Sequence, residues 1–181
     1  GLQRKTACFA MVLGFSRVRY IEFCKRSDLR SLLRCIVNAF EYFGGVPQIL
    51  LTDRMKTVIL QMDQGKATWQ ADFEQFAAEL GFIPKVCRVR RPQTKGKVER
   101  LVDYVKNNFL PGRSFTDLQD LNNQARHWMA IVNNKIHGTT GLVPLLQLAQ
   151  EQLQPLPEDG RHEAYRWEKR KVSMDCFVSY D

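Results

Sequence analysis

The segment VPQILLTDR (residues 46–54) decides the fold, because a short apolar run ends abruptly in the polar pair Thr52-Asp53. A run of this length and composition is typical of a buried strand. A second apolar run of strand length follows at residues 83–89, and a helical pattern separates the two. Strands joined through a helix are expected to be parallel, because a parallel pair needs a long crossover connection. The centre of the chain therefore predicts an α/β sheet.

The flanking patterns add further strands and helices to this plan. The expected strands cover residues 5–13, 19–24, 46–51 and 83–89, and the expected helices cover residues 28–43, 73–80, 95–110, 116–132 and 144–153. Ser27 and Thr116 are the expected N-caps, and Gly44 is an expected helix stop. Residues 55–67 fit a loop with a short strand. This order predicts a mixed α/β sheet flanked by helices.

Composition places the chain among ordinary globular proteins. Of its 181 residues, 44% are hydrophobic and 25% are charged, which excludes general disorder. No run approaches the roughly 18 apolar residues of a membrane span. Five widely spaced cysteines without a CxxC pair predict no zinc site and no disulfide framework, so we expect a cytoplasmic protein. The expected divisions are a core (1–132), a loop, helix and linker (133–160), and a C-terminal piece (161–181).

Positive charge is concentrated in one segment of the chain. The whole chain carries 27 basic and 19 acidic residues, a net charge of +8. Residues 85–106 hold eight basic residues against two acids, which leaves +6 in 22 residues. Such a patch attracts phosphate backbones through counterion release, although a solvated basic face without a partner has the same composition. The basic residues are Lys85, Arg88, Arg90, Arg91, Lys95, Lys97, Arg100 and Lys106.

Two acids are candidate metal ligands. Asp53 follows the buried strand at the sheet edge where open α/β sheets bind ligands. Glu99 lies in the first turns of a helix within the basic segment, beside the apolar face of that helix. Mg²⁺ prefers carboxylate oxygens, and two such ions can stabilise the entering and leaving oxygens of a phosphoryl displacement. The alternatives are that Asp53 caps the turn at residues 54–57 and that Glu99 pairs with Lys95 one helical turn away.

Other polar and aromatic residues allow more than one interpretation. Lys95 and Lys97 are expected phosphate contacts because of the local charge. His137 fits a metal ligand or a phosphate contact, and equally a residue that caps or packs at a helix end. Trp69 and Trp128 are expected in the core. The sequence contains no glycine-rich phosphate loop and no GxSxG nucleophile motif.

Three strings carry a family resemblance. They are CIVNAFEYFGGVPQILLTDRMKT (residues 35–57), VCRVRRPQTKGKVERLVDYVKNNFLPGRSFTDLQDLN (residues 86–122) and HGTTG (residues 137–141). Together they resemble the integrase core of IstA-type transposases from bacterial insertion sequences, and the similarity runs from about Phe9 to the C-terminus. The resemblance implies a ribonuclease-H-like fold of the retroviral-integrase group, with a DDE triad of acids that binds two Mg²⁺ (or Mn²⁺) ions.

On this sequence the resemblance assigns Asp53 as the second acid of the triad and Glu99 as the third. Arg54 stands where the family usually has asparagine, so the neighbourhood of the second acid is altered. The first aspartate belongs to a central strand that would precede residues 5–13. We therefore expect a truncated core with two of the three metal-binding acids and no strand transfer from this chain alone. The resemblance also implies that residues 161–181 begin a small β-barrel.

The implied activity is DNA transposition, in which 3′ ends are cleaved and joined to target DNA. The implied partners are the duplex DNA of the element ends and the target, an AAA+ ATPase of the IstB type, and further copies of the chain. Two other functions remain open: a non-catalytic DNA-binding remnant, which Arg54 favours, and a nuclease of the same fold that only hydrolyses. The expected DNA contacts are Arg90, Arg91, Lys95, Lys97, Arg100 and His137.

Overall fold

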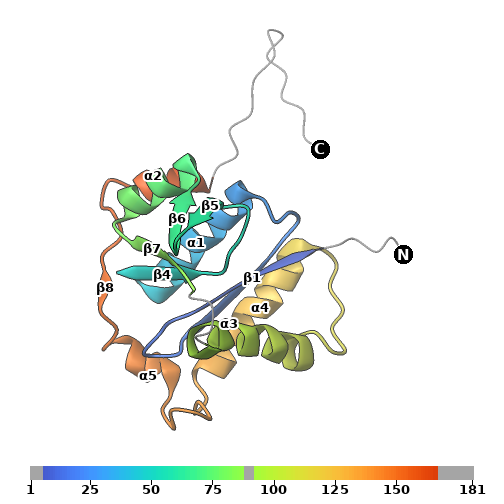
Figure 1. Cartoon of the computed structure of the whole chain (residues 1–181). Coiled ribbons are helices and arrows are strands. Elements are labelled where there is room, and N and C mark those ends of the chain that lie inside the picture. The colour runs from blue at the N-terminus through green and yellow to red at the C-terminus, as the bar shows by residue number, and fades with distance from the viewer. Residues whose placement is uncertain (1–5, 88–91, 167–181) are drawn as a thin grey trace, which may run out of the picture.

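The computed structural model describes residues 6–87 and 92–166, apart from the side chains of residues 92–95. The strands are β1 (Ala7–Val12), β2 (Arg19–Cys24), β3 (Val46–Pro47), β4 (Ile49–Thr52), β5 (Ile59–Asp63), β6 (Lys66–Trp69), β7 (Ile83–Val86) and β8 (Leu153–Gln154). The helices are α1 (Leu29–Phe43), α2 (Ala71–Leu80), α3 (Pro92–Tyr104), α4 (Leu118–Asn133) and α5 (Pro144–Leu148), with a π-helical segment η1 (Val105–Phe109) and a 3-10 helix η2 (Arg161–Tyr165). Figure 1 shows the strands between α2 at one end of the molecule and α3 at the other.

Short strand pairs form the sheet layer of the molecule. β1 and β2 are antiparallel over their whole length. β4 and β7 are parallel, and Thr52 at the end of β4 lies opposite Val86 at the end of β7. This confirms the parallel pairing expected from the helical crossover. Within the described residues the strands form four two-stranded sheets, β1–β2, β3–β8, β4–β7 and β5–β6.

Two strand predictions are wrong in detail. Residues 46–51 do not form one strand, because β3 pairs with β8 whereas β4 pairs with β7. Gly45 permits the close approach of β8, since a Cβ atom there would lie 2.7 Å from the carbonyl oxygen of Gln154. Residues 55–67, expected to be mainly a loop, contribute most of the hairpin β5–β6. Its turn is made by Gln64 and Gly65, which both have positive φ.

The N-caps of two helices differ by one residue from the prediction. Asp28, rather than Ser27, caps α1, because its carboxylate accepts the backbone N–H of Ser31 at 2.8 Å. Asp117, rather than Thr116, caps α4 in the same way. In both cases a carboxylate reaches an N–H three residues ahead and satisfies one of the four free donors at the helix start. Aspartate and its Ser or Thr neighbour are similarly good caps, so the sequence alone did not separate them.

Helix α4 supplies hydrogen-bond partners to the outer edge of β2. Three side chains on one face of the helix form hydrogen bonds with the backbone of every second residue of β2. Each asparagine accepts the N–H of a β2 residue and donates to the carbonyl of the same residue, whereas the methionine accepts one N–H. The pairs are Asn133 with Arg19 (3.0 and 2.9 Å), Met129 with Ile21 (3.0 Å) and Asn122 with Phe23 (2.7 and 3.0 Å). A helix that covers a sheet edge in this way protects it from pairing with another chain.

Aromatic side chains fill the core between β2, η1 and α4. The ring of Trp128 lies 5.4 Å from that of Tyr104 and 5.3 Å from that of Phe109. Phe109 also stacks on Phe23 at 5.7 Å. Trp128 is buried, and the half-buried Trp69 packs against a phenylalanine of α2. Both tryptophans thus have the core role that the sequence predicted.

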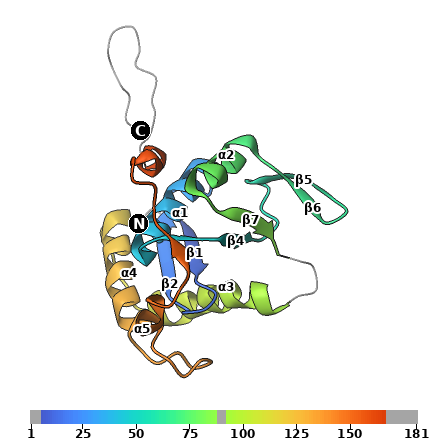
Figure 2. The same cartoon turned by 90° about the vertical axis from the view of Figure 1, so that its left-hand side faces the viewer.

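The chain returns across the molecule after α5. This helix ends at Leu148, before the expected end at residue 153, because Leu153 pairs with β3. η2 then packs against α1 and α2, and Figure 2 shows the returning segment along one side of the molecule. Residues 167–181, expected within the start of a β-barrel, lie outside the described residues. In the part of the chain that the structure describes, no helix is long and apolar enough to cross a membrane.

Candidate functional site

Asp53 lies at the carboxyl end of β4, beside the end of β7. The N–H of Cys87 donates to the carbonyl of Thr52 at 2.9 Å, so the two strands remain paired up to this point. The Asp53 side chain is exposed, and its Oδ1 accepts the N–H of Arg54 at 2.8 Å. This bond agrees with the alternative in which Asp53 caps the turn at residues 54–57. A carboxylate has about four acceptor positions, so the local bond is compatible with a metal ligand as well.

Glu99 lies on α3, and its side chain is exposed. The chain passes from β7 through residues 88–91 to the start of this helix, which packs against β1. Figure 2 shows that the carboxyl ends of β4 and β7 lie on the same side of the molecule as the start of α3. The topology therefore gathers the strand end that carries Asp53 and the helix that carries Glu99 on one side. Joint binding of one metal ion by these two acids stays a prediction.

The donor chemistry of these two acids fits a hard divalent cation. Mg²⁺ is usually bound through one or two carboxylates and completes its octahedral shell with water and substrate phosphates. Within residues 6–87 and 92–166 no group of three or more His, Cys, Asp or Glu side chains is placed to hold a metal ion.

Lys97 connects α3 to the turn between β1 and β2. Its ammonium group donates to the carbonyl oxygen of Gly14 at 3.3 Å. Burial and the positive charge of Arg17 lower the pKa of Lys97, and the negative charge of Glu151 partly opposes them. Lys97 is therefore held against the body of the protein rather than extended into solvent.

The other predicted phosphate contacts differ in how far the structure describes them. Arg100 is exposed on α3. Lys95 lies in the first turns of α3, but its side chain is outside the described part. Arg90 and Arg91 lie outside the described residues altogether. Their roles stay predictions.

His137 organises the loop that follows α4. Its backbone N–H donates to the carbonyl of Leu142 at 2.8 Å, and its ring Nδ1 accepts the backbone N–H of Thr139 at 3.3 Å. Burial and the nearby charges of Arg19 and Arg17 lower its pKa, which favours the neutral ring. These bonds agree with the expected capping role, and a neutral ring can still donate a hydrogen bond from Nε2.

Two arginines near this surface were missed by the sequence analysis. The guanidinium of Arg19 lies over the ring of Tyr104, 5.4 Å from its centroid, and donates to the carbonyl of Val132 at 3.3 Å. Arg17 lies in the β1–β2 turn with a positive φ of 66°. Both are far along the chain from the basic segment, so local charge density gave no signal. The only hint was a basic pair between the expected strands 5–13 and 19–24, with Arg17 in the connecting turn and Arg19 at the start of the second strand.

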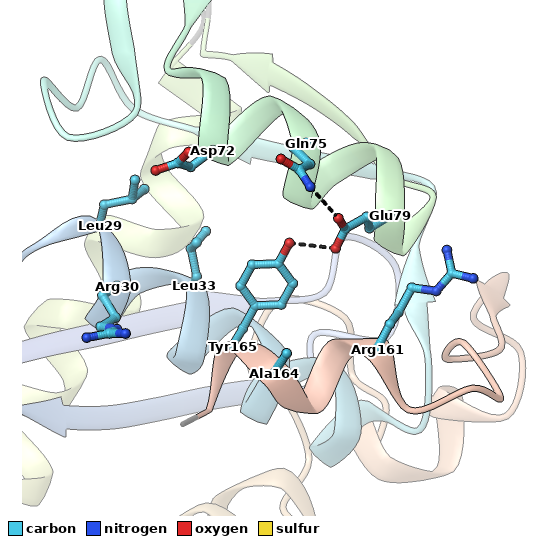
Figure 3. Close-up of a pocket in the computed structure, with 9 residues that line it drawn as sticks. All are labelled: Leu29, Arg30, Leu33, Asp72, Gln75, Glu79, Arg161, Ala164 and Tyr165. Carbon is cyan, nitrogen blue, oxygen red and sulfur yellow. Dashed lines mark hydrogen bonds between the residues drawn. The ribbon is translucent and has the colours of Figure 1, made fainter. Parts of the chain in front are cut away.

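A cavity of about 930 Å³ lies between α1, α2 and η2 (Figure 3). On its wall Glu79 accepts hydrogen bonds from the hydroxyl of Tyr165 at 2.6 Å and from the amide of Gln75 at 2.8 Å. These bonds lower the pKa of Glu79. α2 and α3 lie at opposite ends of the molecule in Figure 1, so the cavity is separate from the basic helix.

The antiparallel and parallel strand pairs, with helices packed on them, define a ribonuclease-H-like α/β fold. A chain of the simian T-cell lymphotropic virus intasome, in complex with PP2A regulatory subunit B56 gamma, shares this fold with a TM-score of 0.56 and 18% sequence identity. The match covers 83% of this chain and 51% of that chain. Residues 1–92 match the family model described as Integrase core domain. The chain belongs to the integrase core domain family.

Its relatives include transposases of bacterial insertion sequences. The putative transposase of element IS5376 from Geobacillus stearothermophilus is 41% identical over 99% of this chain and 45% of its own length. The transposase of IS21 from Pseudomonas aeruginosa is 36% identical over 97% of this chain and 46% of its own length. An IS21-like transposase from Bacteroides fragilis is 37% identical over 94% of this chain and 34% of its own length. These matches confirm the resemblance found in the sequence, and the chain spans less than half of each relative.

Proposed function

We propose that this chain is the catalytic core of a bacterial DNA transposase that cleaves 3′ ends and joins them to target DNA by Mg²⁺-dependent phosphoryl transfer. The observation that carries the proposal is the position of Asp53 at the paired ends of β4 and β7, with the helix of Glu99 directly after β7. Membership of the integrase core family and the transposase relatives support it. The expected place of action is the bacterial cytoplasm, on DNA of the nucleoid.

In this proposal Asp53 and Glu99 would hold the divalent cation through their carboxylate oxygens. A bound Mg²⁺ or Mn²⁺ stabilises charge on the phosphate oxygens and orients the attacking oxygen. Strand pairing fixes the backbone at Asp53, and the helix fixes the backbone at Glu99. Lys97 and Arg100 neutralise neighbouring backbone phosphates, as Lys95, Arg90 and Arg91 are also expected to do. Water attacks the phosphodiester at the element end and releases its 3′-OH, and this 3′-OH then attacks a target phosphodiester in line and displaces the 3′-oxygen of the target strand. Catalysis is mainly positioning and charge neutralisation.

We further propose that a third carboxylate is supplied by a strand between β1 and β4. Among the described strands β1 pairs with β2 and β4 pairs with β7, so each has a second edge that such a strand can use. With Asp53 and Glu99 alone, we expect DNA binding without strand transfer. Residues 133–160 would connect this core (residues 1–132) to a small β-barrel that starts within residues 161–181.

The proposed partners follow from charge and from the family. The basic helix α3 suits the duplex DNA of element ends and target, because phosphate contacts dominate such affinity. Assembly of several copies on paired DNA ends, and a helper ATPase of the AAA+ IstB type, are expectations from the family resemblance.

The decisive experiment is Glu99→Gln in the full-length protein, assayed for end cleavage and for joining into supercoiled target DNA with Mg²⁺. We expect joining to fall at least about a hundredfold, which corresponds to about 2.7 kcal/mol of transition-state stabilisation, whereas DNA affinity stays unchanged. Glu74→Gln is the matched control, since Glu74 is an exposed glutamate on α2.

Each other outcome would assign a different function. Joining that persists in the Glu99→Gln variant would contradict the catalytic assignment of Glu99. DNA binding without cleavage or joining by the wild-type protein would identify a non-catalytic remnant, which Arg54 favours. Cleavage without joining in the wild-type protein would instead identify a nuclease of the same fold.

A further inference from the structure

Basic residues from three distant segments influence one another electrostatically around the turn between β1 and β2. Arg17 belongs to the turn itself, Lys97 to α3, and His137 to the loop after α4. The ammonium of Lys97 donates to the carbonyl of Gly14 in the same turn, at 3.3 Å. Burial is the main cause that lowers the pKa of Lys97 and of His137, and the charge of Arg17 lowers both further. In Figure 1 this turn lies beside α3 and α5.

The turn that carries Arg17 is held in place from both sides. Its ends are closed by the N–H of Leu13, which donates to the carbonyl of Val18 at 3.0 Å. The Glu151 carboxylate accepts the N–H of Ser16 at 2.6 Å and the N–H of Phe15 at 3.3 Å. Glu151 is an acid that faces this cluster, and its two oxygens are thus engaged with the backbone of the turn.

Arg17 has a buried guanidinium nitrogen with no hydrogen-bond partner among the described residues. This atom is Nη1. A buried donor of a charged group that lacks an acceptor is costly, so natural proteins rarely leave one without a hydrogen-bond partner, whether protein, water or ion. The neighbouring Arg19 differs, because its guanidinium lies over the Tyr104 ring and donates to the Val132 carbonyl. Arg17 is therefore the arginine of this surface that has unused donor capacity in a fixed position.

We propose that Arg17, Lys97 and His137 form an oxyanion site that takes one phosphate of the DNA backbone. A guanidinium offers a planar fork of N–H donors that matches a phosphate, the ammonium adds a second charge, and the imidazole adds a hydrogen bond. The site extends the basic track of α3 across the β1–β2 turn and is separate from the acids at the end of β4. It rests on the proposed function, because the phosphate belongs to the DNA on which that function acts.

The test measures binding of a duplex DNA to full-length protein by fluorescence anisotropy, over a series of KCl concentrations. Losing one phosphate contact changes the slope of log K against log salt by about 0.9, which makes binding about eightfold weaker at 0.1 M salt. We expect this change in Arg17→Gln and in Lys97→Gln, for all DNA sequences alike. The matched control is Arg30→Gln, an exposed arginine on α1, for which we expect less than a twofold change.

Thermal unfolding of the same samples separates binding from folding. Because Arg17 Nη1 has no hydrogen-bond partner among the residues that the structure describes, Arg17→Gln is expected to melt no lower than the wild type. A wild-type salt slope in either variant would overturn the phosphate site and leave the proposed function intact. A melting point of Arg17→Gln well below that of the wild type would also overturn it, since Arg17 would then be structural. Failure of the wild-type protein to bind DNA would instead refute the proposed function itself.

Discussion

Asn133 offers a sharp test of how α4 stabilises the edge of β2. The side chain is fully buried. Its Oδ1 accepts the N–H of Arg19 at 3.0 Å, and its Nδ2 donates to the carbonyl of Arg19 at 2.9 Å and to the Tyr42 hydroxyl at 3.1 Å. Leucine has nearly the same shape without the polar atoms, so Asn133→Leu leaves two backbone groups of Arg19 without partners. Each unsatisfied group costs about 1–3 kcal/mol, and because Arg19 is half-buried we expect a total loss of about 2–4 kcal/mol.

The assay is equilibrium unfolding in urea. With a slope of about 2 kcal/mol per M, this loss lowers the urea midpoint by about 1–2 M. The matched control is Asn134→Leu, because Asn134 is exposed and its side chain donates to the carbonyl of Ala130 in its own helix. For this variant we expect a change within about 0.5 kcal/mol. If Asn133→Leu unfolds at the wild-type midpoint, the edge of β2 does not depend on α4 and the reasoning fails.

Two further substitutions test local features of the fold. Gly45→Ala would place a Cβ atom 2.7 Å from the Gln154 carbonyl oxygen, so we expect β3 and β8 to separate at a cost of about 1–3 kcal/mol. Limited proteolysis after β8 should become faster, whereas Gly14→Ala, with nothing within 4 Å of its Cβ position, should behave as wild type. Asp28→Ala removes the cap of α1 and should cost about 0.5–2 kcal/mol at pH 7. The Ser31 N–H lowers the pKa of Asp28, so the cap contributes above the unfolded pKa of about 3.9 and is lost as pH falls through the lower folded pKa. Urea midpoints of Asp28→Ala and wild type should therefore converge at low pH, and a gap that persists there would contradict the capping role.

Local patterns predicted the elements whose signals lie within a few residues. The alternation of residues 19–24 predicted β2 with its observed bounds, and the apolar spacing of α4 predicted the buried Trp128 and Met129. Gly44 ends α1 with a φ of 78°, as its lack of a side chain allows. The errors fall where two local choices have similar energies, as at Ser27 and Asp28, or where a distant segment decides. The division of residues 46–51 is of the second kind, because β8 pairs with β3 from far along the chain.

The sequence likewise predicted part of the candidate site and missed another part. The resemblance assigned Asp53 and Glu99, and the parallel pairing of β4 with β7 supports the placement of both acids on the same side of the molecule. Arg17 was not predictable, because the role of a basic residue in a turn depends on the groups that surround its guanidinium. The sequence also gave no reason to pair Cys24 with Cys35, two buried free thiols whose sulfur atoms lie 3.2 Å apart.

The amino-acid sequence by itself determined the class of fold, the family and the concentration of positive charge near α3, since these depend on composition, periodicity and adjacent motifs. Only the tertiary structure decided that Asn122 and Asn133 complete the edge of β2 and that Arg17 Nη1 is buried without a hydrogen-bond partner among the described residues. The physical reason is that hydrogen bonds and burial are properties of residue pairs. When the partners are separated by a hundred residues, nothing in either segment specifies the other.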